Sequence, residues 1–138
     1  MKKNEPVSHI MTTDIISVHD GEPVSKLRKI FEEHPIQHIP VVSGDKLIGI
    51  ISWNDFMRIS FGEFGNQDAK GLDEILDHTY KIHDVMNKDL TTLSAGSTIR
   101  DAARILGANS FHALPVVDGE KLIGIVTSTD LIRYLAEL

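Results

Sequence analysis

The spacing of apolar residues in the first half of the chain predicts a helix followed by a β-hairpin. Val24, Leu27 and Ile30 recur three residues apart, which is typical of one buried face of an amphipathic helix. Pro35 is expected to end that helix, because its ring cannot continue the backbone hydrogen-bond ladder. Two apolar runs flank Gly44-Asp45, a pair suited to a tight hairpin turn. The returning run, 47–51, is almost wholly apolar, so we expect a strand buried on both faces.

The same order of elements occurs again in the second half. Short extended segments at 15–18 and 90–93 precede the helices, and Pro40 and Pro115 suit the first residue of the next strand. Thr98 and Asp101 resemble a capping box at the start of the second helix. Closing helices are expected after Ser52 and Thr127, with an inner apolar face made by Phe56, Met57, Ile59, Leu131, Ile132 and Leu135.

These two halves are copies of one another. Residues 7–59 align with 82–134 without a gap, and nine of the eleven positions in 40–50 are identical to those in 115–125. Each copy reads β-α-β-β-α, and one copy is too small to bury both helices and both sheet faces alone. We therefore predict an α+β fold in which two pseudo-symmetric motifs pack through their sheets. The predicted divisions are motif 1 at 1–60, a linker at 61–81 and motif 2 at 82–138.

The predicted linker has two parts. Residues 60–71 are rich in glycine and poor in apolar residues, which predicts a loop, whereas 72–77 reads as a short helix. Phe61 and Phe64 could pack on the core or cover a cleft, and we expect them to pack on the core.

Composition narrows the classes of function. The chain has 138 residues, of which 41% are hydrophobic and 25% charged, which are ordinary globular values. A net charge of −6 argues against a dedicated nucleic-acid binder. No run approaches eighteen apolar residues, and no secretion signal is recognised, so we expect a cytoplasmic protein with no membrane span. The absence of cysteine excludes disulfides and thiolate chemistry.

Each copy closes on a Ser/Thr-x-x-Asp motif where a strand becomes a helix, at 52–55 and at 127–130. One carboxylate can accept hydrogen bonds from both hydroxyls of a ribose, and a hydroxyl beside the first helical N–H groups suits a phosphate. Arg58 and Arg133 lie one turn further on and can neutralise phosphate charge. The same motif also serves as a capping box, and exposed arginines are commonly only solvated. Both interpretations stay open.

Two tandem copies that each end in Gly-apolar-x-Ser/Thr-x-x-Asp resemble a pair of CBS motifs, the arrangement called a Bateman module. The resemblance is carried by the segments Gly49 to Asp55 and Gly124 to Asp130. The pairs Met11-Thr12 and Met86-Asn87, near the start of each copy, add to it. The resemblance covers practically all of 7–137. It implies a regulatory module that binds AMP, ADP or ATP in clefts between the motifs, needs no further cofactor and passes the signal to another protein.

The resemblance also implies which residues bind the nucleotide, because the adenine side of one copy pairs with the Ser/Thr-x-x-Asp motif of the other. One site would then comprise Ile16, Gln37, His38, Thr127, Thr129 and Asp130. The other would comprise Thr91, His112, Ala113, Ser52, Asn54 and Asp55. Arg58 and Arg133 would add charge. We expect the Asp130 site to be the better one, since Ser128 and Thr129 are small where the first copy has Trp53.

Other functions are weighed against this one. No catalytic motif is recognised, so we expect no enzyme and no catalytic residue. His34 and His38 have the spacing of metal ligands, but Pro35 interrupts the helix between them, and we expect no metal. The alternatives are a ligand-free interaction module, or a sensor of S-adenosylmethionine, a dinucleotide or a cyclic dinucleotide. If the chain is an energy sensor that acts in trans, its signal must reach an effector protein, which the sequence does not identify. We also expect a homodimer formed by the apolar ends of the closing helices.

Overall fold

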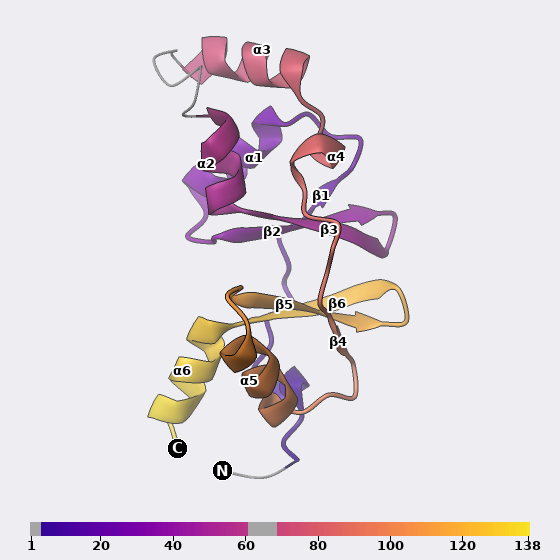
Figure 1. The fold of residues 1–138 in the computed structure, drawn as a ribbon, viewed down its shortest axis with the longest axis vertical. Helices are drawn as coiled ribbons and strands as arrows, with labels where there is room; N and C mark the ends of the chain where they lie inside the picture. The colour runs from indigo at the N-terminus through magenta and orange to yellow at the C-terminus, as the bar shows by residue number, and fades with distance from the viewer. Residues whose placement is uncertain (1–3, 61–68) are drawn as a thin grey trace. The chain divides into compact units, whose positions relative to one another are not determined.

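The computed structural model describes residues 4–60 and 69–138. The elements, in chain order, are the 3₁₀ turn η1 (Val7–His9), β1 (Val18–His19), α1 (Ser25–Glu33), β2 (His38–Ser43), β3 (Lys46–Ser52), α2 (Trp53–Ser60), α3 (Ala69–Thr79), α4 (Ile82–Val85), β4 (Leu93–Ser94), α5 (Ile99–Ala108), β5 (Ala113–Asp118), β6 (Lys121–Thr127) and α6 (Ser128–Ala136). The predicted mixed fold with two copies of β-α-β-β-α is confirmed (Figure 1).

Contacts divide the described chain into two units. The copy-one unit comprises 16–44, 48–60 and 69–90, and the copy-two unit comprises 4–15, 45–47 and 91–138. In the copy-one unit β1 runs parallel to β2, with Val18 beside Val41. In the copy-two unit β4 runs parallel to β5, and β5 pairs antiparallel with β6. The copy-one unit therefore carries β1, β2, most of β3 and the helices α1 to α4, and the copy-two unit carries β4, β5, β6, α5 and α6 (Figure 1).

The segment that precedes each copy in the chain belongs to the unit of the other copy. Thr12, which precedes copy one in the chain, pairs with Ile125 of the copy-two unit through hydrogen bonds of 2.8 and 3.0 Å. Asn87, which precedes copy two, pairs with Ile50 of the copy-one unit in the same way. The contact units therefore do not follow the repeat boundaries, and the divisions at 60 and 82 stay a prediction.

Close packing of methionine on glycine accompanies each of these pairings. A Cβ added to Gly124 would lie 2.5 Å from Met11 Sδ, and one added to Gly49 would lie 2.5 Å from Met86 Sδ. Such distances are far below ordinary van der Waals contact, so any larger residue displaces the methionine. The glycine before the apolar-x-Ser/Thr-x-x-Asp sequence is thus required by this contact.

The hairpin turn is as predicted, but the prolines are not at strand starts. Gly44 and Gly119 occupy the left-handed region at φ 62° and 64°, which favours glycine. Pro40 and Pro115 are instead the third residues of β2 and β5. β5 tolerates Pro115 because the residue opposite it, Ile125, already has its N–H and its C=O hydrogen-bonded to Thr12. Ile125 therefore needs no backbone N–H from position 115.

The linker helix α3 is longer than predicted. Residues 69–71 were expected to be loop and are helical, because Leu72 and the fully buried Leu76 anchor the helix on the copy-one core. α3 packs against α1 and α2 (Figure 1). Phe61 and Phe64 lie outside the described residues.

The closing helices differ in burial from the prediction. Phe56 of α2 is buried, and Met57 and Ile59 pack beside it, so these residues are core rather than an exposed end. In α6, Leu131 packs on the core, but Ile132 and Leu135 are 65% and 59% exposed. Their predicted place on the inner face is wrong, because no described helix lies over α6 as α3 lies over α2.

Candidate functional site

The Ser/Thr-x-x-Asp motif of the copy-two unit forms the junction of β6 and α6. Thr127 N–H donates to Asp130 Oδ2 at 2.8 Å, and Asp130 N–H donates to Thr127 Oγ1 at 3.3 Å. The Thr127 hydroxyl also lies 3.1 Å from Asp130 Oδ2. These reciprocal bonds are a capping box, which satisfies N–H groups that the helix itself cannot pair. The capping interpretation is therefore confirmed at this position.

Capping leaves part of Asp130 available. The carboxylate accepts both of its hydrogen bonds at Oδ2, and among residues 4–60 and 69–138 no hydrogen-bond partner reaches Oδ1. Arg133 is exposed and forms no ion pair within the described chain. Thr129 is exposed at the second position of α6, where its N–H precedes the helical ladder. This junction thus presents a free carboxylate oxygen, a hydroxyl and a backbone donor on one helix start.

The residues predicted for the adenine side of copy two lie around the same strand end. Ser128 N–H donates to the His112 carbonyl at 2.9 Å, and Ser128 Oγ lies 3.5 Å from His112 Nδ1. Ala113 is buried as the first residue of β5, and Thr91 is exposed ahead of β4. His112 and Thr129 therefore lie within one unit, on adjoining ends of β5 and α6.

The copy-one junction has the same cap but a different carboxylate. Ser52 N–H donates to Asp55 Oδ2, and Asp55 N–H donates to Ser52 Oγ, both at 3.1 Å. Arg58, three residues on, binds the other oxygen, Oδ1. Both oxygens of Asp55 are thus engaged, whereas in the part of the chain that the structure describes only Oδ2 of Asp130 is.

The remaining predicted residues of copy one surround this junction. Trp53 N–H donates to the Gln37 carbonyl at 2.8 Å, matching the bond between Ser128 and His112. The Trp53 ring packs edge-on against Phe31, with centroids 5.2 Å apart, and is 39% exposed. Ile16 is half-buried against the core, His38 is half-buried, and Asn54 is exposed.

Each predicted site draws residues from both units. Ile16, Gln37 and His38 belong to the copy-one unit, whereas Thr127, Thr129 and Asp130 belong to the copy-two unit. The other predicted set is divided in the same way. The pairing of adenine side with Ser/Thr-x-x-Asp motif stays a prediction.

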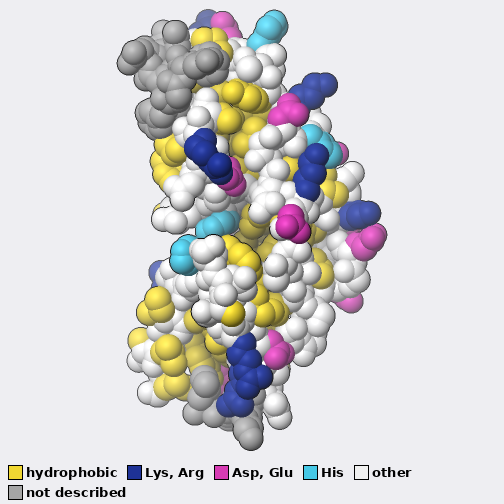
Figure 2. Space-filling model, in the orientation of Figure 1, with side chains coloured by type: hydrophobic (Ala, Val, Ile, Leu, Met, Phe, Trp, Pro, Cys, Tyr) yellow, Lys and Arg dark blue, Asp and Glu magenta, His cyan; other side chains and the backbone are white. Residues whose placement is uncertain are grey.

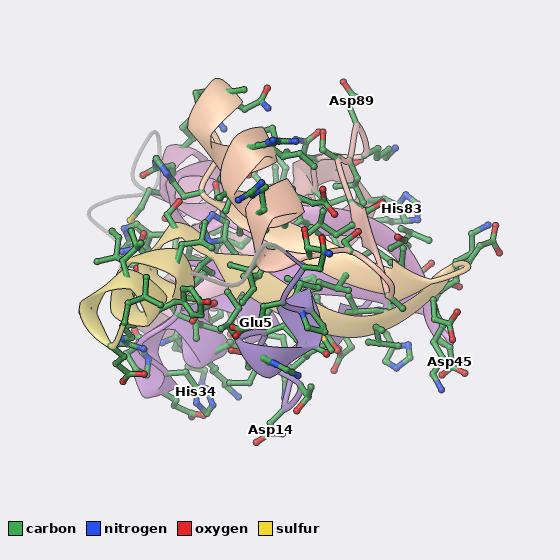
Figure 3. The ribbon with its side chains drawn as sticks, turned by 90° about the horizontal axis from the view of Figure 1, so that it is seen from below. Glu5, Asp14, His34, Asp45, His83 and Asp89 are labelled. Atoms are coloured by element: carbon green, nitrogen blue, oxygen red, sulfur yellow. The ribbon has the colours of Figure 1, made fainter. Side chains whose placement is uncertain are left out.

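Within the described chain, no cluster of three or more His, Asp or Glu side chains could hold a metal ion. His34 and His83, which both belong to the copy-one unit, lie well apart (Figure 3). No helix among 4–60 and 69–138 has the length and apolar character needed to span a membrane.

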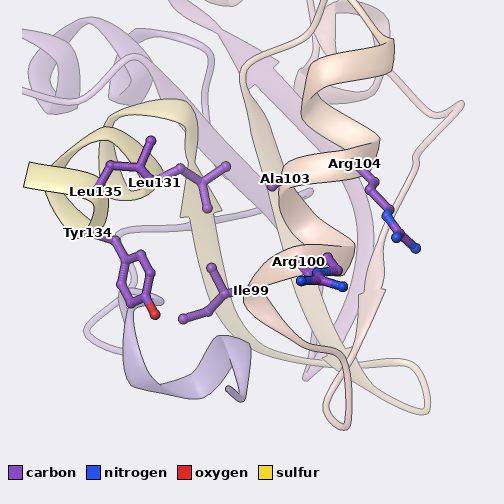
Figure 4. A pocket seen from close by; sticks show the side chains of 7 residues that line it. All are labelled: Ile99, Arg100, Ala103, Arg104, Leu131, Tyr134 and Leu135. Atoms are coloured by element: carbon purple, nitrogen blue, oxygen red, sulfur yellow. The ribbon is translucent and has the colours of Figure 1, made fainter. Parts of the chain in front are cut away.

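An additional groove, which the sequence did not indicate, lies between α5 and α6 of the copy-two unit. It measures about 260 Å³ and has an apolar floor with two arginines on the α5 side (Figure 4). Its lining residues are Ile99, Arg100, Ala103, Arg104, Leu131, Tyr134 and Leu135. Desolvation and a hydrogen bond to the Glu5 carboxylate raise the pKa of Tyr134. Alignment of the two copies offers one signal that this surface differs between them. Ala103 and Arg104 stand where copy one has Arg28 and Lys29, so a long basic side chain is lost at the first of these positions.

Comparison with known proteins identifies the repeated unit. The family model described as "CBS domain" matches residues 7–62 and again 82–137. The protein MJ1225 of Methanocaldococcus jannaschii is 29% identical over 137 residues, covering 97% of this chain and 48% of that protein. An inosine-5'-monophosphate dehydrogenase of the same organism is 31% identical, over 90% of this chain and 22% of the enzyme. The chain thus spans about half or less of the length of these relatives.

Solved structures show the same fold. The crystal structure of MJ1225 superposes with a TM-score of 0.81 at 27% identity, covering 98% of this chain and 49% of that one. CBSX2 from Arabidopsis thaliana, solved in complex with AMP, gives 0.78 at 26% identity and covers 96% and 97% of the two chains. The CBS domain pair of MJ0100, solved with 5'-methylthioadenosine and S-adenosyl-L-methionine, gives 0.71 at 26%, covering 94% and 98%.

Proposed function

The chain belongs to the CBS-domain family and carries two copies of the motif, and on that premise we propose that it is a regulatory module that binds an adenine nucleotide. The observation that carries the proposal is the half-engaged carboxylate of Asp130. Its Oδ1 is available to accept a hydrogen bond from a ribose hydroxyl while Oδ2 caps α6. The family relationship supports an adenosyl ligand, since CBSX2 was solved with AMP.

The groups around Asp130 suit a phosphorylated nucleoside. The start of α6 carries the positive end of the helix dipole, and Thr129 and Arg133 are exposed on its first two turns. His112 lies beside Ser128 and adds a further donor. We propose Thr127, Thr129, Asp130 and Arg133 as the ribose and phosphate side of the better site. Ile16, Gln37 and His38 remain its predicted adenine side.

We propose that the copy-one junction is the weaker site. Binding a ribose there requires Asp55 Oδ1 to exchange Arg58 for a hydroxyl, and Trp53 occupies the place of the small Ser128. Ser52, Asn54 and Asp55 supply its ribose and phosphate side, with Thr91, His112 and Ala113 as the predicted adenine side. Arg58 would then be released toward phosphate.

S-adenosylmethionine is the second candidate ligand, because the MJ0100 pair was solved with S-adenosyl-L-methionine and 5'-methylthioadenosine. These ligands share the ribose with AMP but carry no phosphate. Arg133→Gln separates the two, since loss of the guanidinium weakens AMP binding and leaves 5'-methylthioadenosine binding unchanged.

A thermal-shift screen of AMP, ADP, ATP, S-adenosylmethionine and 5'-methylthioadenosine tests the proposal. A ligand at 100 times its dissociation constant stabilises the native state by about 2.7 kcal/mol. The nucleotide is expected to raise the melting temperature at that concentration. No shift with any of the five at millimolar concentration would leave the ligand-free interaction module as the function.

Asp130→Ala and Asp55→Ala form a matched pair, because each removes the carboxylate that accepts the N–H of the residue before an equivalent helix, Thr127 or Ser52. A lost charge-assisted hydrogen bond costs about 1.5–3 kcal/mol, so Asp130→Ala is expected to weaken nucleotide binding at least tenfold by calorimetry. Asp55→Ala is expected to cost less. Equal losses would contradict the ranking of the two sites.

Three further elements of the proposed role rest on the prediction from sequence: a homodimer, an effector protein reached in trans, and energy sensing. Sedimentation that gives only a 15.3 kDa species at tens of micromolar would remove the homodimer.

A further inference from the structure

Equivalent arginines follow the two Ser/Thr-x-x-Asp motifs, but only one of them is paired. Arg58 and Arg133 each lie three residues after the aspartate of their copy. Arg58 binds Asp55 Oδ1, whereas Arg133 forms no ion pair with any residue among 4–60 and 69–138. Basic and acidic side chains neighbour one another at several places on the face shown in Figure 2, so pairing alone is common. What distinguishes the Arg58 pair is that its carboxylate is the group proposed to bind a ribose.

The Arg58–Asp55 pair lies at the start of α2. Long side chains on a helix point back toward its N-terminus, so Arg58 in the second turn brings its guanidinium to the first turn. The Asp55 side chain is only 22% exposed, whereas the Arg58 side chain is 75% exposed and can leave the carboxylate without unpacking the core. The other oxygen, Oδ2, is held by Ser52 N–H at 3.1 Å. Oδ1 is therefore the oxygen for which a ligand competes with Arg58.

The outcome of that competition depends on the charge that the ligand brings. A ribose hydroxyl is a neutral donor, and a carboxylate binds a charged donor more strongly than a neutral one. A nucleoside without phosphate therefore gives Asp55 a weaker bond than the one it removes. A phosphate at the start of α2 gives the displaced Arg58 guanidinium a new anionic partner, so one ion pair replaces another. The exchange thus favours a ligand that carries phosphate.

The copy-two junction needs no such exchange. Asp130 Oδ1 has no hydrogen-bond partner in the described chain, since Thr127 engages only Oδ2. A ribose hydroxyl can bind Oδ1 there without displacing a side chain. A phosphate beside Arg133 strengthens binding, but a ligand without phosphate breaks no ion pair. The same two residue types at the same spacing therefore impose different requirements on the ligand.

We propose that Arg58 is a specificity-determining residue that makes the copy-one junction selective for phosphorylated nucleosides, whereas the copy-two junction also accepts neutral nucleosides. The inference rests on the proposed function, because it names the ligand class of the same two sites. It gives the sites different ligand preferences in addition to different affinities. Adenosine is expected to fill the copy-two junction first, and the copy-one junction responds to the nucleotide.

Adenosine and AMP differ by one phosphate and are the probes, and single-site chains isolate the junctions. Asp130→Ala leaves the copy-one junction intact, and Asp55→Ala leaves the copy-two junction intact, with circular dichroism used to confirm that each chain is folded. In the Asp130→Ala chain, Arg58→Met removes the guanidinium. Calorimetry is expected to show adenosine bound about threefold more tightly, because no exposed ion pair has to break. AMP loses its contact with the guanidinium, so the ratio of AMP affinity to adenosine affinity is expected to fall about tenfold or more.

Arg133→Met in the Asp55→Ala chain is the matched control. It is expected to weaken AMP binding and to leave adenosine binding unchanged, since Asp130 Oδ1 is already available. Arg58→Lys keeps a cation at position 58 and is expected to retain the preference for AMP. Added sodium chloride tests the same pair without a substitution at position 58, because salt screens an exposed ion pair. Adenosine affinity is expected to rise with salt in the Asp130→Ala chain and to stay constant in the Asp55→Ala chain.

The failure of this inference is distinguishable from the failure of the proposed function. Adenosine binding to the Asp130→Ala chain that responds neither to Arg58→Met nor to salt would overturn the inference and leave nucleotide binding intact. An equal gain in adenosine binding with Arg133→Met would also overturn it, because Arg133 is not paired. Binding of both probes to the Asp55→Ala chain alone would show that the copy-one junction is no site. Binding of neither probe to the unmodified chain would remove the proposed function and this inference together.

Discussion

The two copies begin their first helices differently, and the difference goes together with a covered helical face in one unit and an open one in the other. In copy two, Thr98 and Asp101 form a capping box, with bonds of 2.9 and 3.1 Å, so α5 needs nothing from elsewhere. In copy one, the equivalent residue is Pro23, which has no side-chain acceptor. Asp77 of α3 accepts the Ser25 N–H instead. A cap supplied by a distant residue ties α3 to α1, whereas the cap of α5 is local and involves no covering helix.

The Arg28–Asp73 pair strengthens the same attachment. The guanidinium and carboxylate are only 17% and 21% exposed, and hydrogen bonds to Asp73 and then Glu32 raise the pKa of Arg28. Copy two has Ala103 at this position. An insertion between two repeats has thus become part of one unit, which shows how duplicated motifs with nearly identical hairpins acquire different surfaces.

Removing the leucines from the two faces tests the comparison most strongly. Leu76→Ala empties a fully buried position and is expected to cost about 2–5 kcal/mol of unfolding free energy. Leu135→Ala, at a position 59% exposed, is expected to cost less than about 0.5 kcal/mol. Urea unfolding monitored by circular dichroism measures both. Comparable losses would mean that the α5–α6 face is covered as α3 covers its equivalent.

The glycine contacts test where the copies remain alike. A Cβ at Gly49 meets Met86 Sδ, Cγ and Cβ at 2.5, 2.8 and 3.0 Å, so Gly49→Ala is expected to cost about 1–3 kcal/mol. Gly124→Ala is expected to cost somewhat less, because a Cβ there meets only the Sδ, Cγ and Cε atoms of Met11. Gly124→Ala should therefore cost less unfolding free energy in a Met11→Ala background than in the unmodified chain. An equal cost in both backgrounds would contradict the assigned contact.

The two ways of starting a helix are expected to be of similar strength. Thr98→Ala removes the local cap of α5, and Asp77→Ala removes the distant cap of α1. Each is expected to cost about 0.5–2 kcal/mol. Only Asp77→Ala should also loosen α3, measured as faster amide hydrogen exchange in 69–79. Protection in α3 that is unchanged by Asp77→Ala would show that its leucines alone hold it.

A pH titration gives the smallest effect. Hydrogen bonds from the Thr98 backbone and then its side chain lower the pKa of Asp101 in the folded chain. Asp101 therefore contributes its full stabilisation above the ordinary aspartate pKa of about 4. That stabilisation is lost as the pH falls through the lower pKa of Asp101 in the folded chain. Asp101→Asn should narrow the difference in melting temperature between pH 6 and pH 3. Copy one has Lys26 there, so Lys26→Gln is the control with no such change.

Local patterns in the sequence were sufficient for much of the fold and half of the candidate site. The repeat, the hairpin turns at Gly44 and Gly119, and the end of α1 before Pro35 all follow from residue types a few positions apart. The Ser/Thr-x-x-Asp motifs likewise predicted both a capped helix start and a carboxylate beside it. Such features depend on backbone sterics and hydrogen bonds within one turn, which sequence determines directly.

Tertiary structure decided the differences between the copies. The sequence placed Thr12 and Asn87 with the copies that follow them, yet their strand partners lie in the other unit. It gave no sign that Arg58 would bind Asp55 while Arg133 forms no ion pair with any described residue, because both arginines have the same spacing from their aspartates. Nor did it indicate that Asp77 would cap a helix 52 positions away. These outcomes depend on which groups meet after the chain has closed long loops, and identical local patterns cannot distinguish them.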